Sequence, residues 1–212
     1  MIRYNQVLLH CISEIAKTDK RISEKEIKAN EKLVLQNEEV NHVYIIKEGI
    51  AKCFITENNG KDYILEFFGI GEIIGELEIL NSSKSLSNVE AISSLSLYKI
   101  SKQTFLEILK FNWNFNQLIL QTLATRLAQT ASRASYQQNY PLEYSILKLI
   151  YLFSNQPFKL NKKDLSDYLG ITTRSLNRTL LALQQKGILE GDSLNLVIDQ
   201  SEIAKILNSF EK

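Results

Sequence analysis

One stretch near the carboxyl end, residues 160–189, limits the folds open to this chain more than any other feature. Its sequence, LNKKDLSDYLGITTRSLNRTLLALQQKGIL, predicts two short amphipathic helices around a tight turn. Asn161 can cap the first helix, and Gly170 stands where a left-handed residue would end it. Thr172 or Thr173 can cap the second helix. Helical spacing predicts that six apolar side chains face inward: Leu165, Tyr168, Leu169, Leu176, Leu180 and Leu183.

The outward face of the second predicted helix carries cationic and hydrogen-bonding side chains. Between residues 159 and 186 there are six basic residues and two acidic ones, although the whole chain has a net charge of only +1. A basic patch confined to one motif is the electrostatic footprint of phosphate contact, whereas a merely solvated polar face is the alternative. The pattern predicts a helix-turn-helix that contacts duplex DNA through Lys162, Lys163, Thr172, Thr173, Arg174, Asn177 and Arg178.

The bulk composition is that of an ordinary globular protein, with 44% apolar and 23% charged residues among 212. No apolar run approaches the ~20 residues that a membrane span needs. Residues 1–15 lack the long apolar core and the cleavage site of a signal peptide, so an amphipathic helix is expected there. A cytoplasmic protein with no membrane partner is therefore predicted.

Cysteines and histidines are too few for most metal or redox sites. Cys11 and Cys53 cannot form a disulfide framework or bind an iron–sulfur cluster. Two packed free thiols are the favoured interpretation, and a single redox-active disulfide is the alternative. His10 and His42 lack metal-site spacing, so no metal ligand is predicted. A cupin-like metalloenzyme would need clustered ligands that the sequence lacks, and no catalytic constellation stands out, so the chain is not expected to be an enzyme.

Residues from about 33 to 100 follow the period of β-strands. Asn59-Gly60 predicts a tight hairpin turn, since both residue types tolerate positive φ. Many short strands with regular turns indicate a closed or sandwiched antiparallel arrangement. The expected strands cover residues 43–49, 50–56, 63–68, 89–91 and 95–100.

The period becomes helical from about 102 to 137. A short helix around Phe105 is followed by a long one that begins near Trp113. Its seam has heptad spacing, which favours pairing with a second copy, and a helix buried between the domains of a monomer is the alternative. The expected dimer interface comprises Asn116, Leu120, Leu123, Leu127, Thr130 and Ala134.

The carboxyl-terminal part begins with a hinge at Pro141, which interrupts the helical pattern. Gly187 and Glu190-Gly191-Asp192 separate two short apolar runs that together predict the β-hairpin of a winged helix. Further helices are expected over residues 142–153 and 201–208.

Three zones follow from these patterns, and they define an α+β chain. A β-roll sensor domain with N-terminal helices is expected over 1–110, a long dimerisation helix over 111–138, and a winged helix-turn-helix domain over 139–212.

This order of elements resembles the Crp/Fnr superfamily of bacterial transcription regulators over about residues 30–205. The motifs that carry the resemblance are VYIIKEG at 43–49, FGIGEIIGEL at 68–77 and GITTRSLNR at 170–178. Ile74-Gly75-Glu76 with Tyr140-Pro141-Leu142 is most similar to the YeiL-type branch. The resemblance implies a cyclic-nucleotide-binding-like antiparallel roll, a homodimer on palindromic double-stranded DNA, and contact with RNA polymerase.

The resemblance also implies an effector pocket in the roll. Members that bind cyclic AMP use a Gly-Glu pair at the ribose and an Arg-Ser pair, whose guanidinium neutralises the phosphate. Gly75-Glu76 matches the first pair, but no Arg occurs from 81 to 98, and Lys84 beside Ser85 is the only nearby cation. We therefore expect a pocket at Gly75, Glu76, Lys84 and Ser85 that does not bind cyclic AMP, because a buried phosphate without a partner is severely penalised. Glu76 would then satisfy backbone donors. No cofactor is evident, and an unidentified small-molecule effector remains open.

The expected function is sequence-specific DNA binding by residues 172–184 of each subunit in successive major grooves. Arg174 and Arg178 suit base reading, because a guanidinium can grip guanine O6 and N7, whereas Lys162, Lys163 and Thr172 suit phosphates. Thr173 departs from the Arg of many members, so no target sequence is implied. A module that uses the winged helix for protein contacts instead of DNA is the alternative.

Overall fold

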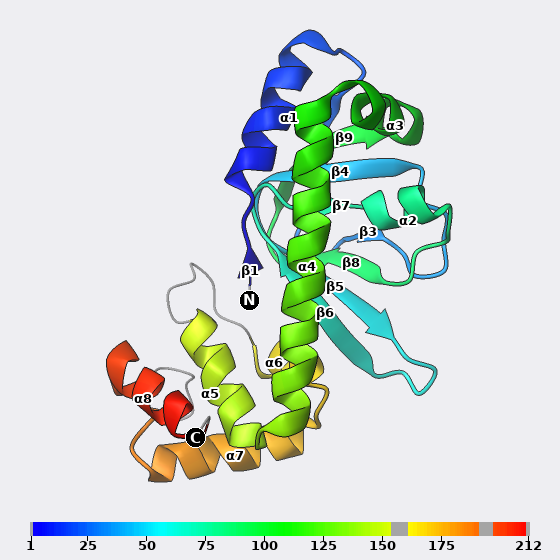
Figure 1. Cartoon of the computed structure of the whole chain (residues 1–212). Coiled ribbons are helices and arrows are strands. Elements are labelled where there is room, and N and C mark those ends of the chain that lie inside the picture. Colours follow the sequence, from blue (N-terminus) through cyan, green and yellow to red (C-terminus); the bar gives the residue numbers. More distant parts are fainter. Residues whose placement is uncertain (1, 154–160, 191–196, 211–212) are drawn as a thin grey trace. The chain divides into compact units, whose positions relative to one another are not determined.

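The computed structural model describes residues 2–153, 161–190 and 197–210, and the chain divides into two compact units (Figure 1). One unit is Ile2–Leu127 and the other Ala128–Lys212. The long helix α4 (Trp113–Asn139) supplies its first part to one unit and its last turns to the other. Helices and mostly antiparallel strands are both present, so the expected α+β class and its order of roll, long helix and helix-turn-helix are confirmed.

Two sheets form the roll of the first unit. Their strand orders are β1-β6-β5-β8-β3 and β2-β9-β4-β7, and the β1–β6 pair alone among these is parallel. The strands are β1 (Ile2–Arg3), β2 (Ser23–Ile27), β3 (Lys32–Val34), β4 (His42–Glu48), β5 (Ala51–Thr56), β6 (Asp62–Phe68), β7 (Ile73–Ile74), β8 (Asn88–Ala91) and β9 (Leu95–Ser101).

The predicted hairpin between β5 and β6 is confirmed. Gly60 has φ 76°, and the Asn59 side chain accepts a hydrogen bond from the Lys61 amide at 3.0 Å. The Glu57 amide donates to the Lys61 carbonyl at 2.8 Å and closes the turn.

The apolar run in β4 is buried on both faces. Tyr44 and Ile46 lie in the cluster that the two sheets enclose, whereas Val43 and Ile45 belong to a second cluster. That second cluster includes side chains of α1 (Gln6–Thr18), α3 (Lys102–Phe111) and the start of α4. Because strand side chains alternate between faces, a strand covered on both sides needs apolar residues at successive positions.

Several elements of the roll were not predicted. Strands begin at Ile2 and Ser23 rather than near residue 33, because β1 has only two residues and β2 is the polar sequence SEKEI. A short helix, α2 (Glu76–Asn81), follows Gly75 within a segment to which the strand period assigns no element. Six residues are too few for a helical period to emerge from the sequence. The predicted amphipathic helix near the amino end is confirmed as α1, which Asn5 caps.

The second unit contains the end of α4, α5 (Leu142–Phe153), α6 (Lys162–Leu169), α7 (Thr173–Gln185) and α8 (Gln200–Phe210). Pro141 separates α4 from α5, as its interruption of the helical pattern predicts, and the hinge expected there stays a prediction because the two units divide between Leu127 and Ala128. Tyr144 is almost fully buried, and its ring stacks on that of Tyr140 with centroids 4.3 Å apart. Edge-on contacts with Tyr136 and Phe210 complete an aromatic core that joins α4, α5 and α8.

Part of the predicted wing lies outside the described residues. The Val197 amide donates to the Ile188 carbonyl at 3.1 Å, which is the pairing expected at the base of a hairpin. The rest of the second predicted run, 194–196, falls among residues that the structure does not describe. Across the described residues, no helix is both long and apolar enough to cross a bilayer.

Both cysteines are free thiols in different surroundings. Cys53 is buried in the roll, where its Sγ lies 3.0 Å from the Ser87 Oγ, and burial raises the pKa of Cys53 to about 12. Cys11 is half-buried on α1 and accepts a hydrogen bond from Asn114 at 3.6 Å, and burial raises its pKa to a smaller extent.

The two thiols are expected to differ in alkylation of the folded protein. Burial raises the pKa of Cys53 further than that of Cys11, so less of Cys53 is ionised at about pH 8, and the thiolate is the reactive form. Iodoacetamide should therefore label Cys11 first and reach Cys53 only after unfolding. Peptide mapping by mass spectrometry measures both sites, and equal labelling of the folded chain would contradict the assignment.

Candidate nucleic-acid interface

The α6–turn–α7 segment has the caps that its sequence predicts. The Asn161 Oδ1 accepts a hydrogen bond from the Asp164 amide at 2.7 Å, and Gly170 ends α6 with φ 67° and ψ 29°. Thr172, rather than Thr173, caps α7, because its Oγ1 accepts from the Ser175 amide at 3.1 Å. The turn of residues 170–172 joins two stabilised helix ends and fixes where α7 begins.

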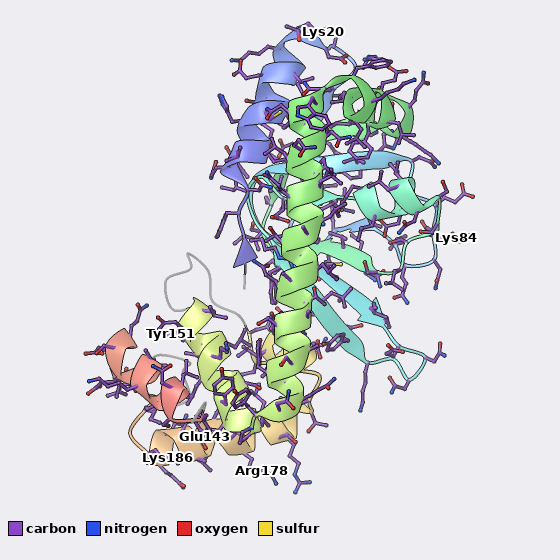
Figure 2. The ribbon with its side chains drawn as sticks, in the orientation of Figure 1. Lys20, Lys84, Glu143, Tyr151, Arg178 and Lys186 are labelled. Carbon is purple, nitrogen blue, oxygen red and sulfur yellow. The ribbon has the colours of Figure 1, made fainter. Side chains whose placement is uncertain are left out.

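Helix α7 has a buried apolar face and an exposed polar face. Leu176, Leu180 and Leu183 are buried, as predicted, while Arg174 and Arg178 are exposed. Neither guanidinium forms an ion pair with any residue that the structure describes. Figure 2 shows Arg178 projecting away from the helices of this unit. Four exposed side chains form the outer face of α7: Thr173, Arg174, Asn177 and Arg178.

The remaining predicted contact residues lie at the amino-terminal ends of α6 and α7. Lys162 is half-buried, and Lys163 is exposed and forms an ion pair with Asp167 at 2.7 Å. Such an exposed pair contributes little stability, so Lys163 can exchange Asp167 for a phosphate. Helix amino termini attract anions, and two of them lie in this motif. The hydroxyl of Thr172 is exposed but engaged in capping α7.

Two further side chains position the helix-turn-helix, and neither was predicted. Arg133 of α4 stacks on the Tyr168 ring, with its Cζ 3.7 Å from the ring centroid, and donates to the Tyr168 carbonyl. Lys186, at the end of α7, forms an ion pair with Glu143 of α5 at 2.7 Å, and Figure 2 labels both residues. These contacts attach α6 and α7 to the neighbouring helices of the second unit.

In the roll, α4 contributes a second buried arginine. The Nη2 of Arg126 lies 2.6 Å from Glu72 and donates to the Ile73 carbonyl at 2.7 Å, and its Nη1 donates to Glu76. Its Nε lies 3.9 Å from Glu66, which Arg3 also contacts at 2.6 Å. We call this set, Arg3, Glu66, Glu72, Glu76 and Arg126, the roll charge cluster.

The environment of the cluster shifts two pKa values. Burial raises the pKa of Glu76, and Arg126 opposes that rise. Burial alone would lower the pKa of Arg126, but the carboxylates outweigh it and the pKa of Arg126 is raised. The guanidinium therefore remains charged inside the roll.

This geometry adds a partner to the predicted role of Glu76. Its carboxylate was expected to satisfy backbone donors, and it accepts a hydrogen bond from its own backbone amide. It also pairs with the guanidinium of Arg126, a residue that was not among the predicted site residues. The signal was present, because Arg126 and Arg133 are the only charged residues in the 27-residue α4 and lie seven positions, about two turns, apart.

The other predicted pocket residues do not share one environment, since Ser85 is buried and Lys84 is exposed. Gly75 precedes α2 with φ 92°, and a Cβ there would lie 2.7 Å from the His42 carbonyl oxygen. Ser85 is buried, and its Oγ donates to the Ser87 carbonyl at 2.7 Å. Lys84 is exposed and projects outward from the loop after α2 (Figure 2).

The predicted seam of α4 is largely uncovered by the chain itself. Leu120 is 55% exposed and Leu127 is 73% exposed, and Thr130 and Ala134 are exposed as well. Leu123 is half-buried against the second cluster, and the half-buried Asn116 donates to the Leu109 carbonyl at 3.0 Å. The buried face of the helix lies beside the seam, about 100° around the helix axis, and comprises Phe115, Ile119, Thr122, Arg126, Arg133 and Tyr136.

Two family models match the chain. A cyclic nucleotide-binding domain covers residues 24–112, and a Crp-like helix-turn-helix domain covers residues 123–206. The chain belongs to the Crp/Fnr family of transcription regulators. Members of this family are regulators rather than enzymes, and this Crp/Fnr regulator has both parts of the family architecture. The models match the family as a whole, so the YeiL-type branch stays a prediction.

Individual relatives agree with this assignment at low identity. The cAMP-activated global transcriptional regulator CRP of Salmonella typhimurium is 20% identical over 177 residues, which span 78% of this chain and 84% of the relative. A probable transcriptional regulator, flp, of Lacticaseibacillus casei is 24% identical over 155 residues, spanning 70% and 71%.

Solved structures show that the fold of this Crp/Fnr regulator is shared. The c-di-GMP responsive global regulator CLP of Xanthomonas campestris has a TM-score of 0.78 at 17% identity, with 88% of this chain and 98% of that chain covered. A Crp/Fnr-family regulator of Thermus thermophilus has a TM-score of 0.77 at 14% identity, with 89% and 100% covered.

Proposed function

We propose that this Crp/Fnr regulator binds palindromic DNA as a homodimer, with α7 of each subunit in a major groove. The observation that carries the proposal is the outer face of α7, where Arg174 and Arg178 are exposed and have no ion-pair partner in the described chain. Two related half-sites would lie one helical turn, about 34 Å, apart.

The exposed seam of α4 supports the homodimer. Leu120 and Leu127 are seven residues apart, so they lie on one face of the helix, and both are largely exposed. In a monomer these exposed leucines contribute little hydrophobic stabilisation, whereas a second copy of α4 would remove them from water. The α4 seams are the proposed dimer interface.

Different side chains of the helix-turn-helix would contact the bases and the phosphates of the duplex. The exposed side chains of Arg174, Asn177 and Arg178 would contact base edges, because a planar guanidinium matches the two acceptors of guanine. Lys162, Lys163 and Thr172, at the helix amino termini, would contact phosphates and set the orientation. The proposal includes a cytoplasmic location and RNA polymerase as a further partner.

The roll is proposed not to bind cyclic AMP. The roll charge cluster has three carboxylates and two guanidinium groups, which leaves a formal charge of −1, and residues 81–98 contain no Arg for a phosphate. A cyclic phosphate would therefore enter a site that already has excess negative charge. The proposal includes no cofactor.

Selection of bound sequences from a random pool of duplex DNA tests the proposal. A recovered palindrome is expected, with affinity that falls steeply as salt increases because phosphate contacts release counterions. Failure to retain any duplex in dilute buffer would contradict DNA binding and favour a protein-interaction module.

Arg178→Ala is expected to cost about 1–3 kcal/mol of discrimination at one base pair of the selected site. The reason is loss of a bidentate contact to one base. Mobility-shift titrations against single-base variants of the site measure this loss. In the matched variant Lys163→Ala, affinity should fall about equally for all sequences, and the salt slope should decrease by about 1. Unchanged selectivity in Arg178→Ala would refute the base-reading role.

A further inference from the structure

The inner face of the sheet β2-β9-β4-β7 changes from apolar to basic toward one end (Figure 1). Ile46 of β4 and Leu97 of β9 lie in the cluster that the two sheets enclose. Side chains of a strand alternate between its faces, so Lys25 of β2, His42 of β4 and Lys99 of β9 share this inner face. Two lysines and a histidine therefore follow directly on the apolar core of the roll.

Tyr44 lies at the centre of these basic side chains. The centroid of its ring is 6.2 Å from that of His42 and 5.4 Å from the Nζ of Lys25. Lys99 is directly opposite Tyr44 in the antiparallel register, which makes the two side chains neighbours. We call this set, Lys25, His42, Tyr44 and Lys99, the inner basic cluster.

The inner basic cluster has no anionic partner among the residues that the structure describes. Lys25, His42 and Lys99 are each half-buried, and none of them forms an ion pair within those residues. Burial lowers the pKa of His42, and the charges of Lys99 and Lys25 lower it further. The charges that act on this imidazole are thus positive, and a bound anion would relieve their repulsion.

The elements packed around His42 bring no carboxylate into contact with it. The inner-face residues of the neighbouring strand ends are Ser23, Lys25, Ile74, Lys99 and Ser101. Glu38 and Glu39, which precede β4, are exposed and form no ion pair in the described part of the chain. Lys102, the first residue of α3, is exposed as well and would add positive charge.

The Tyr44 hydroxyl is an unused hydrogen-bond donor. Tyr44 is only 8% exposed, and no described residue forms a hydrogen bond with this hydroxyl. The described side-chain atoms that are fully buried without a partner all belong to arginines, so the hydroxyl of Tyr44 reaches solvent. Burial raises its pKa, which keeps the hydroxyl protonated at neutral pH. A polar group in such a place calls for a partner, and an anion is one that it can donate to.

We propose that the inner basic cluster binds a phosphate dianion, either free or as the monoester group of a small effector. Lys25 and Lys99 supply two permanent positive charges, and His42 supplies a third when it takes up a proton. The Tyr44 hydroxyl donates to a phosphate oxygen. A dianion matches these charges better than a phosphodiester, which has a single negative charge. This inference goes beyond DNA binding and does not depend on it.

Lys47 provides a matched control on the opposite face of the same sheet. Its Nζ lies 5.1 Å from the centroid of the Tyr98 ring, much as Lys25 lies over Tyr44. Lys47 differs in having a carboxylate already, because it pairs with Glu24 at 2.6 Å. We therefore expect Lys47→Gln to bind phosphate as the wild type does.

NMR of the imidazole signals of the full chain tests the proposal. Inorganic phosphate, glycerol phosphate, dimethyl phosphate or chloride is added at constant ionic strength. The chain has two histidines, and His10, exposed on α1, serves as the internal reference. Phosphate or glycerol phosphate should shift the His42 signals with a dissociation constant below about 1 mM.

The other ligands identify which anion the site prefers. Dimethyl phosphate, a monoanion, should bind at least about tenfold more weakly, and chloride should give no saturating shift. Tighter binding of glycerol phosphate than of inorganic phosphate would assign the site to a monoester effector, and the reverse order to the free ion.

Substitutions in the inner basic cluster should weaken binding without unfolding the roll. Lys25→Gln and Lys99→Gln should each raise the dissociation constant at least about fivefold, because each removes a charge-assisted contact. Tyr44→Phe should raise it about threefold, since it deletes only the hydroxyl. Neither glutamine breaks an ion pair in the described chain, so the circular dichroism of both variants should match the wild type.

The protonation of His42 gives a readout that general ionic screening would not move. A bound dianion favours the imidazolium, so saturating sulfate, whose charge is constant near neutral pH, should raise the pKa of His42. Binding should accordingly strengthen as the pH falls through that pKa. In Lys99→Gln without any anion, the pKa of His42 should also rise, because one of the cations that lowers it has been removed.

Several results would overturn the proposal. One is a phosphate titration that shifts His10 and His42 equally, and another is dimethyl phosphate binding as tightly as phosphate. A folded Lys25→Gln/Lys99→Gln variant with wild-type phosphate affinity would also do so. Binding of hexaglutamate without any response to phosphate would assign the cluster to an acidic protein partner instead. None of these measurements uses DNA, so they remain decisive even if the proposed DNA-binding function fails.

Discussion

Gly71→Ala is expected to destabilise the roll by more than about 3 kcal/mol, a large effect for a single methyl group. Gly71 has φ +83°, where an L-residue costs about 1–2 kcal/mol. In addition, a Cβ at this position would lie 2.0 Å from the carbonyl oxygen of Asn5 and 2.4 Å from its carbonyl carbon. Both atoms belong to the backbone that begins α1, so no side-chain rotation can relieve the overlap.

Gly60→Ala is the matched control for this effect. Gly60 has φ +76°, similar to Gly71, but nothing lies within 4 Å of the position that a Cβ would occupy there. Only the conformational cost, about 1–2 kcal/mol, should remain. Urea denaturation of both variants, followed by circular dichroism, measures the difference, and equal losses would show that the packing at Asn5 is unimportant.

Leu120→Asp combined with Leu127→Asp is expected to raise the dimer dissociation constant at least about a hundredfold, or roughly 3 kcal/mol. Both leucines are exposed in the single chain, so the substitutions should leave the fold intact. In a paired α4 seam, four carboxylates would meet in place of four apolar side chains, and like charges repel. Sedimentation velocity over a range of concentrations measures the change.

Leu86→Asp is the control for the dimer prediction, because Leu86 is 67% exposed in the loop after α2 and lies off the seam. It should sediment as the wild type does. The double variant should also lose most of its operator affinity, because a monomer engages one half-site. An unchanged dimer in the double variant would place the association surface elsewhere.

The helix-turn-helix could be predicted almost residue by residue, because its determinants are local. Asn161, Gly170 and Thr172 act on backbone groups within a few positions, and the spacing of Leu176, Leu180 and Leu183 defines one helix face. The hairpin at Asn59-Gly60 was found for the same reason. Local signals thus account for most of the carboxyl-terminal unit and for the main strands of the roll.

The roll charge cluster could not be predicted in this way. Glu76 and Glu72 lie 50 and 54 positions from Arg126 in the sequence. Sequence periodicity carries no information about which distant elements meet. Lys84 was grouped with Ser85 because the two are adjacent, but one is exposed and the other buried. Two isolated charges in a long uncharged helix, Arg126 and Arg133, were the available clue.

The position of Trp113 gives the molecule a built-in optical reporter. It is the single tryptophan of the chain, it begins α4, and it is 76% exposed. Indole emission shifts to shorter wavelength as water leaves the ring, so the spectrum of the unlabelled protein can report whether subunits bury the start of this helix. No dye or added residue is needed to follow that event in real time.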